Sequence, residues 1–188
     1  MDYLKFISEI LSPTMVAMYV TIIFSLYSQL SVFNILLCIF IGNLFLSLIP
    51  TVSIYYLSKT GYADTEFSKR ERRAIVYLIG LLCFVIASLI FWLLNFHIMF
   101  LISMAYVFVT SAVFIINLFW KISAHSAGVA GPTTALVYVF GPTLIPLYVV
   151  TLLVIWVRLK IKVHNLKQLI AGALIAIFIT SLVYTILW

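Results

Sequence analysis

Two of the three histidines in this 188-residue chain lie beside basic residues, a combination that suits chemistry on phosphate groups. His125 follows Lys121 and Ser123. His164 follows Arg158 after five intervening residues. A planar guanidinium binds phosphate oxygens in pairs, and a histidine can serve as a nucleophile or as a proton donor. Together the two groups predict a site for phosphoryl transfer, provided that the fold brings them to one place.

Further polar groups are expected beside these histidines. Gln168 lies four residues after His164, a spacing that permits contact at the start of a helix. A helix that begins just after His125 would direct free N–H groups toward the same place. A basic loop adds candidate phosphate ligands, namely Lys69, Arg70, Arg72 and Arg73.

Each of these residues also has a simpler interpretation. A histidine near a membrane interface is often only a polar residue among the lipid headgroups, and basic residues beside apolar segments commonly set topology. No cysteine or carboxylate lies beside the two histidines at metal-ligand spacing, so we expect no metal site. His97 lies away from the charged groups, and we assign it no role. Cys38 and Cys83 lie inside apolar runs and are interpreted as small core residues.

The composition indicates a membrane protein. The chain is 65% hydrophobic and 9% charged, whereas soluble domains are about 45–50% apolar and about 25% charged. The net charge of +6 is therefore interpreted as basic residues at a membrane face, and we expect no nucleic acid partner. The apolar runs lack the alternation of a barrel strand. We predict an all-α, polytopic transmembrane helix bundle that forms a single domain over residues 1–188.

Four charge-free runs set the number of membrane segments. Runs 10–58 and 74–120 each have the length of two helices, and run 168–188 has the length of one. Polar turns near Gln29 and near Asn95 divide the two long runs. These runs therefore supply five segments.

The remaining run, 122–157, decides the topology because it is too long for one span and short for two. Gly141 and Pro142 break it in the middle, since proline cannot donate to the helix ladder and disfavours a helical residue before it. We predict a hairpin of two short helices, about 126–140 and 143–158. The total is about six to seven membrane segments.

This count places the charged loops at one membrane face. Loops 59–73, 120–125 and 158–167 then lie on the same side as the N-terminus, whose first residues we interpret as an interfacial segment before a retained helix. The opposite turns carry no formal charge. His125 and His164 meet only if the hairpin forms, because a single span would put them on opposite faces.

The order of these groups resembles the type 2 phosphatidic acid phosphatase superfamily of integral-membrane lipid phosphatases. The signature of that family is K-x6-R-P, then P-S-G-H, then S-R-x5-H-x3-D. The third motif is matched in spacing by Arg158 and His164, with Gln168 where aspartate is expected. The second motif corresponds to Ser123 and His125, and the basic loop occupies the place of the first.

The resemblance implies a role for each matched residue. His164 would attack phosphorus and form a phosphohistidine, and His125 would protonate the leaving oxygen. Arg158 would hold the phosphoryl oxygens as the charge on them changes. The further phosphate-binding positions that it implies are Ser123, Lys121 and, in the basic loop, Arg72 ahead of Arg73, Lys69 and Arg70.

The resemblance covers about residues 59–188. Gln168 is its main departure from the family pattern. A glutamine carbonyl can accept the Nδ1–H bond of His164 but brings no negative charge. We therefore predict a slower enzyme, or compensation by an acid of another loop, either Glu71 or Asp64. A pseudoenzyme is the further alternative.

The expected substrate is a lipid with its phosphate at headgroup level. The candidates are a polyprenyl or dolichyl-type diphosphate, which the several cations favour, and phosphatidic acid or phosphatidylglycerophosphate. Phosphoryl transfer through histidine requires no metal, so we expect no cofactor. The positive-inside rule favours a cytoplasmic site, because Lys5, Lys59 and Lys167 share its face.

The alternative class is a non-enzymatic membrane protein, such as a lipid carrier or transporter. Ionisable groups at midplane depth would favour a transporter, and inverted repeats are common in that class. The sequence shows neither feature, and its charges stay at the ends of the spans. The oligomeric state is left open.

Overall fold

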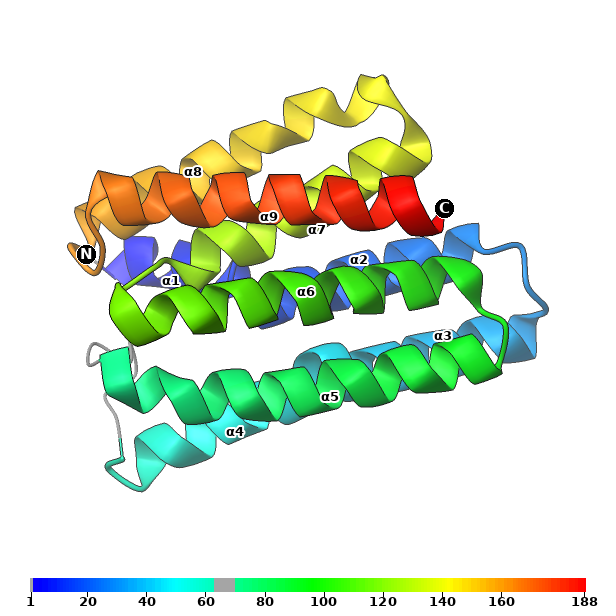
Figure 1. Ribbon diagram of the computed structural model, residues 1–188, viewed down its shortest axis with the longest axis horizontal. Helices are drawn as coiled ribbons and strands as arrows, with labels where there is room; N and C mark the ends of the chain where they lie inside the picture. The colour runs from blue at the N-terminus through cyan, green and yellow to red at the C-terminus, as the bar shows by residue number, and fades with distance from the viewer. Residues whose placement is uncertain (1, 63–69) are drawn as a thin grey trace.

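A computed structural model describes residues 2–62 and 70–188 of the chain, and this part is built from helices (Figure 1). The first half contains α1 (Asp2–Ile10), α2 (Pro13–Tyr27), α3 (Val32–Gly42), the π-helical segment η1 (Asn43–Leu48) and α4 (Ile49–Lys59). The second half contains the 3₁₀ turn η2 (Arg70–Arg72), α5 (Arg73–Leu93), α6 (His97–Phe119), α7 (Ala124–Phe140), the 3₁₀ segment η3 (Pro142–Leu147), α8 (Tyr148–Lys160) and α9 (Leu166–Leu187).

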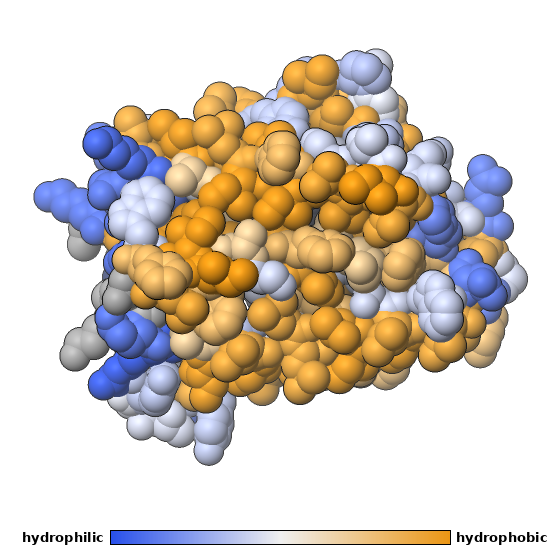
Figure 2. Space-filling view, in the orientation of Figure 1, coloured by the Kyte–Doolittle hydropathy of each residue, from blue (hydrophilic) through white to orange (hydrophobic). Residues whose placement is uncertain are grey.

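The predicted all-α, polytopic helix bundle is confirmed. Five helices of the described part are long and apolar enough to cross a membrane, and these are Val32–Lys59, Arg73–Leu93, His97–Phe119, Pro142–Lys160 and Leu166–Leu187. Helices α1 and α2, bent by 44° at their junction, add a sixth candidate if they are taken as one span. Figure 2 shows a broad apolar band over the long helices. These features fit an integral multi-pass membrane protein.

The turns form where polar residues and glycine permit them. Gln29 and Asn95 adopt positive φ angles of 53° and 59° between successive helices, a conformation that asparagine tolerates better than most residues. Ser31 caps α3 by accepting a hydrogen bond from the backbone N–H of Asn34. The turns predicted at Gln29 and Asn95 are therefore confirmed.

The hairpin in the second half is present. Gly141 has a φ of 93°, a conformation that favours glycine, and the chain reverses there between α7 and η3. Two details differ from the sequence-based prediction. The first helix begins at Ala124, because Ser123 caps it, and the second begins as a 3₁₀ segment, because Pro142 and Pro146 interrupt regular helical bonding.

Helix α7 is the central helix of the bundle and packs against α2, α6, α8 and α9. Most of its residues are buried, and many of them are small, including Gly128 and Gly131. Small residues allow close approach between helices in a membrane protein. The crossing with α2 is an example, because a Cβ on Gly128 would lie 2.5 Å from the Cβ of Pro13. The start of α7 is therefore fixed tightly within the bundle.

The chain ends and loops have the arrangement that the segment count predicts. The N-terminus, the α6–α7 connection and the α8–α9 connection lie at one end of the bundle, and the C-terminus lies at the other (Figure 1). Hydrophilic side chains gather at both ends of the bundle (Figure 2), and the two connections at the first end carry Lys121 and Lys162. We call this first end the charged end.

Candidate active site

A cavity of about 680 Å³ lies at the charged end of the bundle. Four of its lining side chains carry the chemistry expected of the site: His125, His164, Arg158 and Arg73. They come from α7, from the α8–α9 connection, from α8 and from α5 respectively. The hairpin and the start of α5 thus bring two histidines and two guanidinium groups to one space.

His164 is held by the first turn of α9. Its Nδ1 lies 3.2 Å from Oε1 of Gln168, and the same oxygen accepts a hydrogen bond of 3.1 Å from the backbone N–H of Asn165. Asn165 in turn caps α9, because its Oδ1 accepts from the backbone N–H of Gln168. Since Gln168 Oε1 is an acceptor, Nδ1 of His164 must carry the proton. The lone pair is then on Nε2, the ring nitrogen that Gln168 does not engage.

The surroundings of His164 keep its ring neutral. Burial and the nearby cations Arg73, Arg158 and Lys121 together lower its pKa from 6.5 to about 3. The hydrogen bond with Gln168 acts in the opposite direction but is the weaker effect. A neutral imidazole with a free nitrogen lone pair is the form that a nucleophile requires.

His125 is positioned by the junction between α7 and α9. Ser123 accepts a hydrogen bond of 3.3 Å from the backbone N–H of Ser126, which starts α7 one residue before His125. The backbone N–H of Ser123 donates a hydrogen bond to the backbone carbonyl oxygen of Gln168. The two helices can approach this closely because Gly172 has no Cβ, which would lie 2.5 Å from the carbonyl oxygen of Ser123. The two histidine-bearing segments are therefore fixed to one another.

Arg158 is 2% exposed in the last turn of α8. Its Nη1 donates a hydrogen bond of 3.0 Å to the hydroxyl oxygen of Ser8 in α1. Its position against the cavity and beside both histidines suits the binding of an anion.

Arg73 is the cation of the basic loop that reaches the cavity. It is 6% exposed at the first residue of α5, and its Nη1 donates to the carbonyl oxygen of Ile122, 3.2 Å away. Arg72, one residue earlier, points elsewhere: it donates to the carbonyl oxygen of Gly61 and lies over the ring of Tyr62. The resemblance favoured Arg72 over its neighbours, and the structure places Arg73 at the cavity instead.

Ser123 and Lys121 are not among the described residues that line the cavity. Ser123 is fully buried as a helix cap, and Lys121 donates from Nζ to the carbonyl oxygen of Val163, 3.0 Å away. Both residues connect the segments that carry the histidines. Arg70 opens the turn η2. Lys69 and Asp64 lie outside the described residues.

Sequence reasoning missed one wall of the cavity, which α1 provides. Four polar residues of the N-terminal segment line it: Lys5, Ser8, Glu9 and Ser12. Lys5, Ser8 and Glu9 share one face of α1 by their i, i+3, i+4 spacing, and Ser12 is the N-cap of α2. These polar residues of the N-terminal segment were the signal in the sequence that could have identified this wall. Glu9 is a carboxylate at the cavity, whereas Glu71, proposed to compensate for Gln168, lies exposed on η2.

Comparisons with known proteins provide no relative. The chain matches no protein-family model, no curated protein and no solved structure. Within the described residues, no group of three or more His, Cys, Asp or Glu side chains is arranged to hold a metal ion. The functional interpretation therefore depends on the cavity and its side chains.

Proposed function

We propose that the protein is a membrane lipid phosphatase similar to the type 2 phosphatidic acid phosphatases. It would hydrolyse a phosphate or diphosphate headgroup at the charged end of the bundle. The observation that supports this proposal is the cavity lined by His125, His164, Arg158 and Arg73. A phosphate group needs positive charge around its oxygens, a nucleophile and a proton donor, and these four side chains supply all three.

The first step forms a phosphohistidine. Nε2 of His164 attacks phosphorus while Arg158 and Arg73 hold the non-bridging oxygens. The bond between phosphorus and the leaving oxygen breaks as the N–P bond forms. The negative phosphate group favours the protonated form of His125, which gives its proton to that oxygen; the oxygen departs with the lipid alcohol or, for a diphosphate, with the lipid monophosphate.

The second step releases phosphate. His125, now neutral, takes a proton from a water molecule as the water oxygen attacks phosphorus. The N–P bond breaks, the electron pair returns to Nε2 of His164, and inorganic phosphate leaves. Gln168 holds the Nδ1 proton through both steps, but its neutral carbonyl stabilises positive charge on the ring less than a carboxylate would. This fits a slower enzyme.

Phosphate release from purified protein tests the proposal. The substrates are farnesyl diphosphate, phosphatidic acid and phosphatidylglycerophosphate, and the variants are His164→Ala and His125→Ala. We expect each variant to lose about 100-fold or more of the wild-type rate. His97→Ala is the matched control, because His97 begins α6 at the other end of the bundle.

The outcomes separate the alternatives. Equal release by the wild type and both histidine variants would reject the enzyme. Loss in only one variant would mean that the roles of His125 and His164 are wrongly assigned. Lipid phosphate binding without release would identify a carrier or a pseudoenzyme, for which the uncharged Gln168 beside His164 provides a physical reason.

A further inference from the structure

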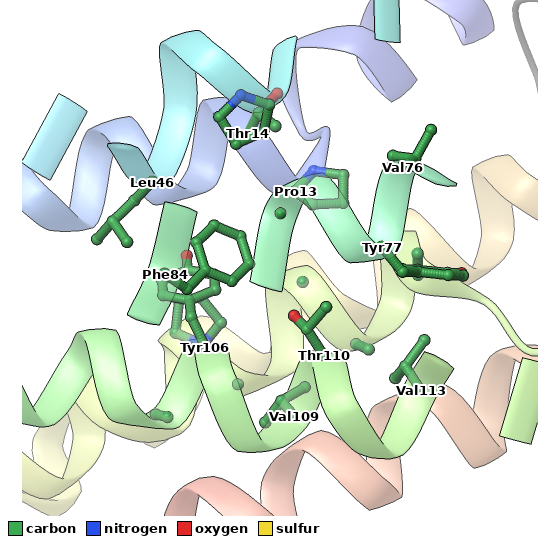
Figure 3. Close-up of a pocket in the computed structure, with 18 of the residues that line it drawn as sticks. Pro13, Thr14, Leu46, Val76, Tyr77, Phe84, Tyr106, Val109, Thr110 and Val113 are labelled. Carbon is green, nitrogen blue, oxygen red and sulfur yellow. The ribbon is translucent and has the colours of Figure 1, made fainter. Parts of the chain in front are cut away.

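A second, apolar chamber adjoins the charged cavity. The two spaces share six lining residues, which are Pro13, Thr14, Ile54, Val76, Tyr77 and Ala124. From this shared wall the chamber continues between α5 and α6, past Val76, Phe84, Tyr106 and Val113 (Figure 3). A ligand with its phosphate beside His164 would therefore have its hydrocarbon part directed into this chamber.

Resting on the proposed function, we propose that the substrate is a single-chain lipid phosphate and that the chain segment nearest the phosphate lies in this apolar chamber. The candidate substrates have one feature in common. Each carries a single hydrocarbon chain, either prenyl or alkyl, attached to a phosphate or diphosphate. Phosphatidic acid and phosphatidylglycerophosphate carry two acyl chains, which the chamber does not admit together, so this inference disfavours them.

The chamber is too small for two chains. Its volume is about 140 Å³, close to the ~150 Å³ of a protein cavity that accommodates one benzene molecule. The lining along α5 extends from Val76 to Phe84, or about 12 Å of helix at ~1.5 Å per residue. A space of this volume and length is narrow, so it admits one segment of chain at a time.

The lining favours hydrocarbon over a polar ligand. Leu46, Phe84, Ile102 and Val109 supply branched or aromatic walls, and Gly80 leaves room between them. Transfer of apolar groups from water into such a space is favourable in proportion to the area removed. Chain binding here would hold the headgroup against the two histidines.

Gly80 provides a substitution that fills the chamber. A Cβ on Gly80 would meet only the Phe84 ring, at 3.6 Å, which is ordinary van der Waals contact. Gly80→Leu therefore introduces bulk into the chamber without a backbone clash at its Cβ. Gly80→Ala is the mild version, and Leu82→Phe adds bulk on the same helix at a side chain that is 62% exposed.

The test is photo-crosslinking in detergent micelles, with adducts mapped by mass spectrometry. The probes are farnesyl phosphate, hexadecyl phosphate and phosphatidic acid, each with a diazirine at the same depth in its chain. We expect the two single-chain probes to label chamber residues such as Phe84 and Val109. Gly80→Leu should reduce this labelling about tenfold or more, whereas Gly80→Ala and Leu82→Phe should retain it.

Three results would overturn the inference: equal labelling of the chamber by phosphatidic acid, labelling that Gly80→Leu leaves unchanged, or no labelling of the chamber by either single-chain probe. Ala105→Ile narrows the chamber from α6 and serves as a second variant if Gly80→Leu does not fold. Labelling requires no turnover. Chamber labelling by a protein that releases no phosphate would therefore overturn only the proposed function. Phosphate release from farnesyl phosphate without chamber labelling overturns only the single-chain inference.

Discussion

At the scale of single residues, Gln168 determines the state of the proposed nucleophile. Its carbonyl oxygen fixes the Nδ1–H tautomer of His164 while adding no negative charge. The pKa of His164 is consequently governed by burial and by the neighbouring cations, which lower it to about 3. The ring therefore remains unprotonated through the neutral and mildly acidic range.

This leads to a prediction for the pH dependence of Gln168→Asp. A carboxylate beside Nδ1 favours the imidazolium, so it raises the pKa of His164. The acid limb of kcat/KM, which reports the free enzyme, should move to higher pH in the variant, and kcat at neutral pH should rise. Wild-type kcat/KM should show no limb from His164 above about pH 4. Identical profiles for the two proteins would contradict this role of Gln168.

Glu71→Ala is the companion to that experiment. Glu71 lies exposed on η2 and does not line the described cavity, so we expect its removal to leave the rate within about threefold. Compensation for Gln168 by Glu71 would instead produce a large loss in Glu71→Ala and little gain in Gln168→Asp. Measured rates for the two variants decide between these cases.

Adjacent arginines provide a second residue-scale prediction. Arg73→Ala should lower kcat/KM for phosphate release about 100-fold or more, because a preplaced cation at the transferring group is lost. Arg72→Ala should change it less than about threefold, since Arg72 contacts Gly61 and Tyr62 instead. Equal losses would show that the loop contributes general charge and not one specific contact. Arg72→Ala removes the same charge from the same loop, so it controls for the change in net charge.

The choice between these two arginines could not be made from the sequence. Both are basic, and the resemblance supplies only an approximate position for the loop. Which one faces inward depends on the rotation of α5 about its axis where it begins, at Arg73. That rotation is set by tertiary packing, including the contact with Ile122.

At the scale of elements, close crossings of helices hold the site together. Gly172 of α9 lies against Ser123 and Ser126 at the start of α7, where an added Cβ would come within 2.5 Å and 2.6 Å of their oxygen atoms. The crossing ties the helix that carries His125 to the one whose cap holds His164. The geometry of the proposed active site thus depends on a glycine that does not itself line the cavity.

We expect Gly172→Ala to separate the two helices and to lower the free energy of unfolding by about 1–3 kcal/mol. Phosphate release should fall with it, because His125 shifts relative to His164. Gly80→Ala is the matched control: its Cβ meets only ordinary contacts, and alanine is the better helix former by about 1 kcal/mol. Thermal unfolding in detergent measures both. A Gly172→Ala protein as stable and active as the wild type would refute this account of the crossing.

Most helix boundaries could be predicted from the sequence, but the role of α1 as a wall of the cavity could not. Glycine, proline and polar turn residues marked the helix ends, as Gly141 shows for the hairpin. The sequence predicts an interfacial N-terminal segment because Asp2 and Glu9 lie where a signal peptide would carry basic residues. A helix that lies among lipid headgroups and a helix that closes a polar cavity show the same sequence pattern, with polar residues on one face and apolar residues on the other. Only the packing of α1 against α8 distinguishes them.

At the scale of the whole molecule, the separation of charge predicts a membrane orientation. We propose that the charged end faces the cytoplasm, following the positive-inside rule. Lys167→Cys should react with a membrane-impermeant maleimide only after cells are lysed, and His97→Cys should react in intact cells. The native Cys38 and Cys83 are buried, which keeps background labelling low. The reversed labelling pattern would place the site outside.

The far separation of the chain ends has a practical consequence. Residues of α1 form part of the cavity wall, and the C-terminus lies at the opposite end of the bundle (Figure 1). An affinity tag or fluorescent protein joined ahead of Asp2 would therefore lie beside the opening through which the proposed substrate would enter. The same fusion joined after Trp188 would leave that opening clear, so proteins intended for turnover assays should carry their tags there.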